Sequence, residues 1–88
     1  MAAKTPDSVL RESTGSLTLH IAVFSTNDID DGDTYASGIK EIVGYWANGT
    51  DDPTQTKEGI DVSLSSSTFT FNTGENDRTG ILYVLSRT

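Results

Sequence analysis

The feature that most constrains the fold is the alternation of side chains in residues 60–86. Apolar residues stand at every second position in three short runs: Ile60, Val62 and Leu64, then Phe69 and Phe71, then Ile81, Tyr83 and Leu85. A period of two places one row of side chains in a core and the other towards solvent or a partner, as in a half-buried antiparallel strand. The last third of the chain therefore predicts three strands, joined by turns at residues 65–67 and 73–80.

A further strand is predicted at residues 16–25, where both faces carry apolar groups. Leu17, Leu19, Ile21 and Val23 alternate there with Thr18, His20, Ala22 and Phe24. Such a strand is typical of the centre of a sandwich or of a contact with a second subunit. His20 is the only histidine and has no acid or nucleophile beside it in the sequence. We therefore expect His20 to pack and hydrogen-bond, rather than to act as a ligand or general base.

Residues 35–50 fit two patterns. One face of a helix would carry Ile39, Ile42, Val43 and Trp46. A strand buried on both faces would carry Ile39, Val43 and Tyr45 on one side and Ile42 and Trp46 on the other. Gly38 and Gly44 disfavour a helix, whereas the β-branched and aromatic content favours a strand. We predict a strand that is interrupted near Gly44. Tyr45 and Trp46 are its largest apolar side chains, and either suits core burial or an interface.

The chain has 88 residues, which is enough for one domain with a thin core. We predict an all-β fold, a small antiparallel β-sandwich or barrel of about five to seven strands, in which residues 16–88 form a single β domain. Residues 1–15 hold only Val9 and Leu10 as a compact apolar pair and predict an extended N-terminal arm. We expect these two residues to dock on a neighbouring subunit, with an arm folded back on its own domain as the alternative.

The most acidic stretch, residues 26–34, holds four aspartates around a glycine: Asp28, Asp30, Asp31 and Asp33 around Gly32. An EF-hand pattern fails, because Gly32 at its sixth position puts Ile29 at the third, where an oxygen ligand is required. The composition favours a solvated turn in which Asp and Asn side chains cap their own backbone and Gly32 has a positive φ. A looser cation site built from the four aspartates is the alternative.

Charge and composition narrow the classes of function. The formal net charge is -7, from 13 acidic against 6 basic residues, so we expect no nucleic-acid partner. The absence of cysteine excludes disulfides and thiolate metal sites. Without a signal-like or membrane-spanning apolar run, we expect no membrane partner. No activated nucleophile, carboxylate pair or phosphate-binding glycine loop is recognisable, so we expect no enzyme, no catalytic or metal residue and no cofactor.

Four stretches suggest a family: Leu19-His20-Ile21-Ala22-Val23-Phe24, Asp31-Gly32-Asp33-Thr34-Tyr35 with Ser37-Gly38-Ile39, Thr68-Phe69-Thr70-Phe71, and Leu82-Tyr83-Val84-Leu85. With them the chain resembles small all-β virion proteins of tailed bacteriophages, of the capsid decoration or head-associated type. The resemblance implies a structural protein that binds the outer capsid surface as a cement and stabilises the particle. The implied partners are the major capsid protein and copies of the chain itself, as a homotrimer. The implied location is the capsid surface of a virion assembled in the host cytoplasm.

We predict four interface residues: Val9, Leu10, Tyr45 and Trp46. The alternative functions are a tail-associated structural protein and a small ligand-binding β module. In the latter, Tyr45, Trp46 and the acidic stretch would bind carbohydrate or Ca²⁺. The strand order and the face that meets a partner do not follow from the sequence alone.

Overall fold

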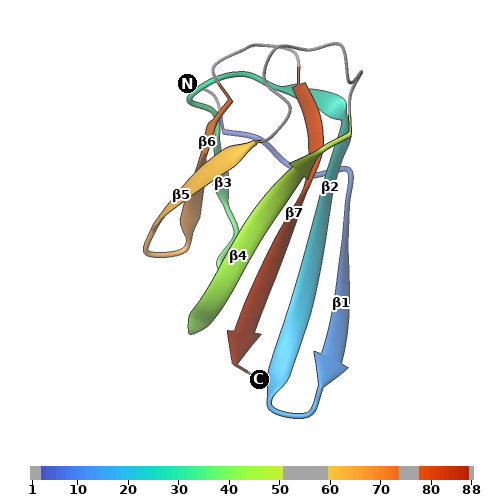
Figure 1. The fold of residues 1–88 in the computed structure, drawn as a ribbon, viewed down its shortest axis with the longest axis vertical. Coiled ribbons are helices and arrows are strands. Elements are labelled where there is room, and N and C mark those ends of the chain that lie inside the picture. The colour runs from blue at the N-terminus through green and yellow to red at the C-terminus, as the bar shows by residue number, and fades with distance from the viewer. Residues whose placement is uncertain (1–2, 51–59, 74–77, 88) are drawn as a thin grey trace.

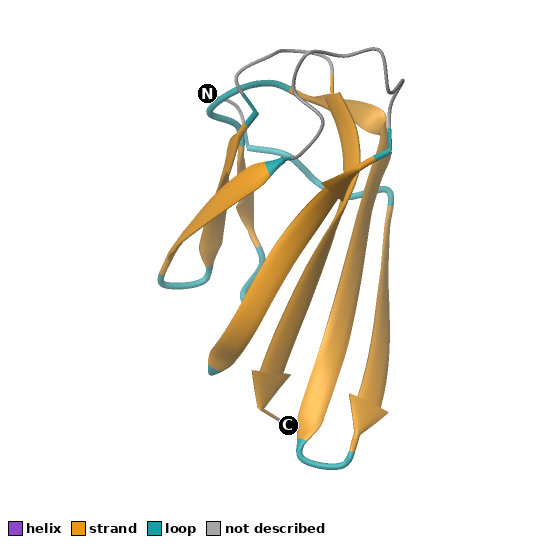
Figure 2. Cartoon of the chain, viewed as in Figure 1, coloured by secondary structure: helices purple, strands orange, loops and turns teal. Residues whose placement is uncertain are grey.

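The computed structural model describes residues 3–50, 60–73 and 78–87, which form seven strands and no helix (Figure 1, Figure 2). The strands are β1 (Ser8–Thr14), β2 (Leu17–Ile29), β3 (Thr34–Ala36), β4 (Ile42–Gly49), β5 (Asp61–Ser65), β6 (Thr68–Asn72) and β7 (Arg78–Arg87). They form two antiparallel sheets, in the orders β1-β2-β7-β4 and β3-β6-β5. The predicted all-β sandwich is confirmed. In this part of the chain no helix long and apolar enough to cross a membrane is found.

The four-stranded sheet is built around β7, which pairs with β2 on one side and β4 on the other. Buried and partly exposed side chains alternate along β7, as its sequence predicts. Leu82 and Val84 face the core and are almost inaccessible to solvent. Gly80 allows close contact with β4, since a Cβ atom there would lie 2.7 Å from the Asn48 carbonyl oxygen.

Aromatic side chains join the two sheets. The Phe24 ring of β2 makes edge-to-face contacts with Tyr35 and Phe71, with centroids 5.6 and 5.2 Å apart. Tyr45 of β4 meets Phe69 of β6 in the same way, at 5.3 Å. Such pairs add about 0.5–1.5 kcal/mol each to the stabilisation from burial alone. The aromatic cluster therefore fixes how the smaller sheet lies on the larger one.

The smaller sheet is much shorter than the larger one. Figure 1 shows β1, β2 and β7 continuing along the long axis well past the ends of β3, β5 and β6. The principal extents of 39 × 23 × 19 Å reflect this difference. Part of the inner face of the four-stranded sheet is therefore left without a second layer of strands.

The predicted N-terminal arm is not confirmed. Residues 8–14 form β1, which pairs with β2 along its whole length and reaches it through a turn at Gly15, where φ is +76°. Val9 packs against the core, and the Lys4 backbone N–H donates to the Thr34 carbonyl at 2.7 Å. The segment thus folds back on its own domain, which was the alternative. Ladder pairing holds it there, although its sequence is mostly polar.

Two predicted boundaries need correction. β2 continues through an irregular register after Phe24 as far as Ile29, so residues 26–29 are not part of the predicted turn. Ile29 is 1% exposed, and the burial of this one apolar side chain among aspartates explains the longer strand. At the C-terminal side, β7 already begins at Arg78, which is fully buried, so the turn predicted at residues 73–80 ends earlier. Residues 74–77 lie outside the described residues.

The strand predicted over residues 35–50 is divided in two. Residues 37–41 form a connection between β3 and β4 in which Gly38 and Glu41 have φ values of +71° and +53°. A positive φ cannot be accommodated in a regular strand, so the segment breaks there. The predicted interruption near Gly44 is confirmed by the register shift between Ile42 and Gly44. The turn predicted at residues 65–67 is also confirmed.

We expect Phe69→Ala to lower the free energy of unfolding by about 3–5 kcal/mol, because it leaves a cavity in the core. Phe69 is fully buried and contacts aromatic rings from both sheets. The control is Val43→Ala, at a position 50% exposed, where we expect a loss of about 0.5 kcal/mol or less. Urea unfolding followed by fluorescence measures both. Equal losses in the two variants would contradict this account of the core.

Candidate functional site

The four predicted interface residues lie on opposite sides of the four-stranded sheet. Val9 and Tyr45 face inward and pack against the core and its aromatic rings. Leu10 and Trp46 face outward and are 55% and 44% exposed. Trp46 stacks on Tyr83, with ring centroids 4.9 Å apart and an interplanar angle of 11°. Leu10 and Trp46 are therefore surface residues and Val9 packs within the domain, whereas Tyr45 contacts Phe69 and is still 36% exposed.

The outward side chains form continuous rows, because residues directly opposite each other on paired strands share one face of the sheet. The central row across β1, β2, β7 and β4 is Leu10, Ile21, Tyr83 and Trp46. The rows on either side of it are Ser8, Val23, Ile81 and Asn48, and Glu12, Leu19, Leu85 and Gly44. We call the apolar members of the three rows the outer apolar face: Leu10, Leu19, Ile21, Val23, Trp46, Ile81, Tyr83 and Leu85.

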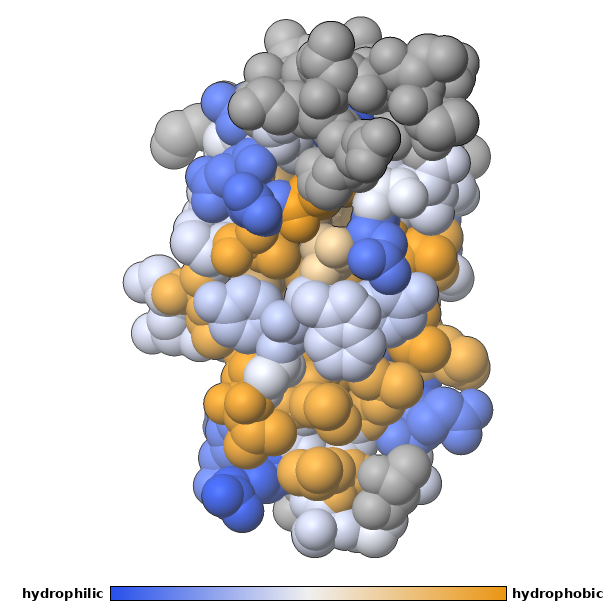
Figure 3. Space-filling model, in the orientation of Figure 1, coloured by the Kyte–Doolittle hydropathy of each residue, from blue (hydrophilic) through white to orange (hydrophobic). Residues whose placement is uncertain are grey.

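The outer apolar face is unusual for the solvent side of an antiparallel sheet, which normally carries polar residues. Its members between Leu10 and Trp46 are only partly buried, and the shorter sheet lies on the opposite side of these strands. Glu12 is the one charged residue in the three rows. Figure 3 shows hydrophobic side chains gathered over the lower half of the molecule, where β2, β7 and β4 run. Contiguous apolar surface is a common feature of interaction sites, which makes this face the candidate site.

Sequence reasoning found two of the eight members of this face. The other six come from β2 and β7, and the signal for them was the presence of apolar residues on both sides of each strand. That signal alone leaves open whether the second side meets a second sheet or a second subunit. The pairing of β2 and β7 in the middle of one sheet supplies the missing information, because it places all six on the same side.

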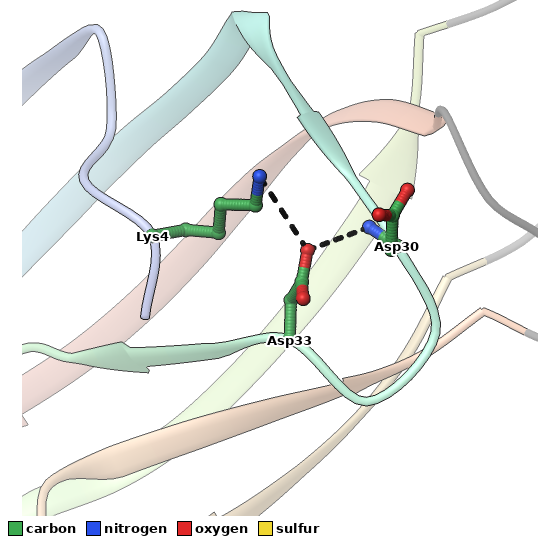
Figure 4. A network of polar contacts seen from close by, with 3 residues as sticks. All are labelled: Lys4, Asp30 and Asp33. Atoms are coloured by element: carbon green, nitrogen blue, oxygen red, sulfur yellow. Dashed lines mark hydrogen bonds and ion pairs between the residues drawn. The ribbon is translucent and has the colours of Figure 1, made fainter. Parts of the chain in front are cut away.

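The acidic stretch forms a turn organised by Asp33. Asp33 Oδ2 accepts a hydrogen bond from the Asp30 backbone N–H at 2.8 Å and lies 3.7 Å from Lys4 Nζ (Figure 4). Gly32 has φ +89°, so the predicted backbone capping and positive φ are both confirmed. Asp33 is only 2% exposed, however, so the centre of the turn is not solvated. The side chain of Asp28 lies outside the described residues, and the side chains that are described contain no group of three or more metal-ligating residues.

His20 lies on the inner face of β2, where it is buried. Its Nε2 is 2.9 Å from Ser86 Oγ, whereas its Nδ1 has no hydrogen-bond partner in the described chain. The predicted packing and hydrogen bonding of His20 are confirmed. A histidine and serine pair alone falls short of a hydrolytic triad, which needs an acceptor on Nδ1 to orient the base. Burial, and in second place the charge of Arg11, lowers the pKa of His20 below its usual value of 6.5.

We expect wild type to lose stability on acidification partly through His20. Because its pKa is lower in the folded than in the unfolded protein, its contribution is complete above pH 6.5 and is lost as the pH falls through the lowered value. The charged groups around it are Arg11 from β1, Arg87 from β7, and Lys40 and Glu41 from the connection. Urea unfolding from about pH 7.5 to about pH 5.5 should show a steeper loss for wild type than for His20→Gln. Parallel losses in the two proteins would contradict the lowered pKa.

Comparison of the chain with family models, with curated proteins and with solved structures finds no match in any of the three.

Proposed function

We propose that this protein is a non-enzymatic structural protein that assembles with copies of itself through the outer apolar face. We further propose that it decorates the outer surface of a bacteriophage capsid. The observation that carries the assembly step is the row Leu10, Ile21, Tyr83 and Trp46, which crosses all four strands on the side away from the core. The capsid setting rests on the sequence resemblance to head-associated virion proteins.

Burial of the outer apolar face would stabilise an assembly. Moving one large apolar side chain fully out of water contributes about 1.5–3 kcal/mol, and the face offers several that are already partly desolvated by their neighbours. Trp46 and Tyr83 are stacked before any partner arrives. Aromatic residues held rigidly near the centre of a contact are the type that contributes most to binding, because little side-chain entropy is lost.

The distribution of charge favours contact through this face. A chain with a net charge of -7 repels its own copies, and the repulsion is smallest where the approaching surfaces carry few charges. Glu12 stands on the edge strand β1, at the border of the three rows, where an interface normally has its polar rim. Acidic residues elsewhere on the surface oppose edge-to-edge growth of the sheets.

Light scattering after size exclusion, repeated over a concentration series, tests the assembly step. We expect wild type to show a multiple of the chain mass of 9.4 kDa, with three chains as the resemblance implies. Leu10→Glu introduces a charge into the central row, and we expect it to shift the protein to the monomer. Ser65→Glu is the matched control, because it adds the same charge at an exposed position of another edge strand, β5. A wild-type monomer at all concentrations, or equal behaviour of the two variants, would overturn the proposal.

The capsid setting has its own test. We expect quantitative mass spectrometry of purified particles of the virus that encodes the chain to detect it in a copy number comparable to that of the major capsid protein. Decoration is non-covalent in this proposal, so denaturant at a concentration that leaves the shell intact should release it. Absence of the chain from purified particles would overturn the capsid setting and leave the self-assembly to be judged on the light-scattering result.

A further inference from the structure

A cavity of about 480 Å³ opens beneath the inner face of the four-stranded sheet, at the end that β3, β5 and β6 do not reach. Its walls are β1, β2 and β7 on one side and the connection of residues 37–41 on the other. The connection is held in place by hydrogen bonds. The Arg87 backbone N–H donates to the Glu41 carbonyl at 3.0 Å, and Ser37 Oγ donates to the Ser67 carbonyl at 2.7 Å.

The inner face changes character where it lines the cavity. Under the smaller sheet its rows are apolar, for example Val9, Ala22, Leu82 and Ala47. Two rows further along, the same side of the same strands carries Ser13, Thr18 and Ser86, all of which line the cavity. Inward-facing hydroxyl groups add nothing to a hydrophobic core, so on β1, β2 and β7 this part of the inner face is polar, while Ile39 and Ile42 beside it pack against the core.

Positive charge is concentrated in the cavity. Arg11 and Lys40 line it, and Glu41 is its one acidic lining residue. Arg87 also borders it, but at a position of β7 that alternates to the outer side of the sheet. Neither Arg11 nor Lys40 forms an ion pair within the described residues. Together these two side chains outweigh the single negative charge of Glu41, and a bound anion would balance the excess positive charge.

His20 provides a second, independent indication of a ligand. It lines the cavity with 9% of its surface exposed, its Nε2 contacts Ser86 Oγ, and its Nδ1 has no partner among the described residues. A buried polar atom without a partner is costly and needs a reason. Protonation of His20 next to a bound anion would turn both ring nitrogens into donors and add a further positive charge to the cavity.

We propose that this cavity binds a small phosphate-class oxyanion, with Arg11 and Lys40 as the charged ligands and His20 and Ser86 at its buried side. A doubly charged tetrahedral anion attracts the two cations more strongly than a singly charged carboxylate does, and arginine binds phosphate oxygens with two parallel hydrogen bonds. The cavity has room for more than the anion alone, so both free phosphate and a small phosphate monoester fit the same chemistry. The site lies on the opposite side of the sheet from the outer apolar face, so it is independent of the proposed assembly.

The test uses the full chain and the C2–H proton resonance of its single histidine, together with backbone amide spectra. Inorganic phosphate and glycerol 3-phosphate are added at constant ionic strength, to about 20 mM, well above the dissociation constant of about 1 mM expected for exposed cations. We expect saturable shifts for the lining residues. Tighter binding of the monoester would identify an organic phosphate as the ligand, and equal binding would identify free phosphate.

Two substitutions and a control separate a site from general charge attraction. We expect Arg11→Gln and Lys40→Gln each to weaken phosphate binding about tenfold, since a charged hydrogen-bond donor is lost. Lys4→Gln removes the same charge beside Asp33 at the other end of the sandwich and should change binding less than about twofold. Lys40 lies in the connection and not in a strand, so we expect Lys40→Gln to fold even if Arg11→Gln does not. In that case Lys40→Gln alone tests the contribution of the charged ligands.

Sulfate tests whether an anion binds beside His20. The charge of sulfate stays constant over the pH range in which histidine titrates, so a shift in the pKa of His20 would come from sulfate binding and not from titration of the anion. We expect saturating sulfate to raise the pKa of His20, read from the C2–H shift, and chloride at equal ionic strength to leave it unchanged. The proposal is overturned if phosphate shifts do not saturate, if acetate binds as tightly as phosphate, or if the Lys4→Gln control loses as much affinity as Lys40→Gln.

Discussion

The pairing of β7 between β2 and β4 is the interaction on which the rest of the molecule depends. It joins residues that are far apart in the chain, such as Leu19 and Leu85, and completes the larger sheet. Because β7 is central, its inward side chains pack in the core, and its outward side chains lie in the middle of the outer apolar face. The aromatic contacts between the sheets and the wall of the cavity both rest on the register that this pairing sets.

Much of the fold was predictable because alternation is a local property. Four of the strands, β2, β5, β6 and β7, follow from period-two patterns that each residue shares with its near neighbours. β1 was not predictable, since its mostly polar sequence is held by ladder hydrogen bonds to β2 rather than by an apolar row of its own. Ile29 was missed for a similar reason, as a single buried side chain makes no pattern.

The candidate sites were harder to predict than the strands. Tyr45 and Trp46 are adjacent in the sequence, and size alone made both of them candidates for an interface. The pleat of β4 places them on opposite faces, so Tyr45 contacts Phe69 of the smaller sheet and Trp46 stacks on Tyr83, while both remain partly accessible to solvent. Arg11 and Lys40 are far apart in the sequence, and only the strand order β1-β2-β7 together with the connection brings them to one cavity. Clustering of this kind depends on non-local pairing, which composition and spacing do not encode.

The place of β7 at the end of the described chain has a consequence for biosynthesis. While the ribosome is still making the chain, β2 and β4 exist without the strand that separates and joins them, and long-range pairing of this kind is in general slow to form. Neither face of the larger sheet is complete before residues 78–87 have left the ribosome. A prematurely terminated chain therefore lacks both surfaces at once, so the order of synthesis itself keeps incomplete copies out of any assembly that requires the finished sheet.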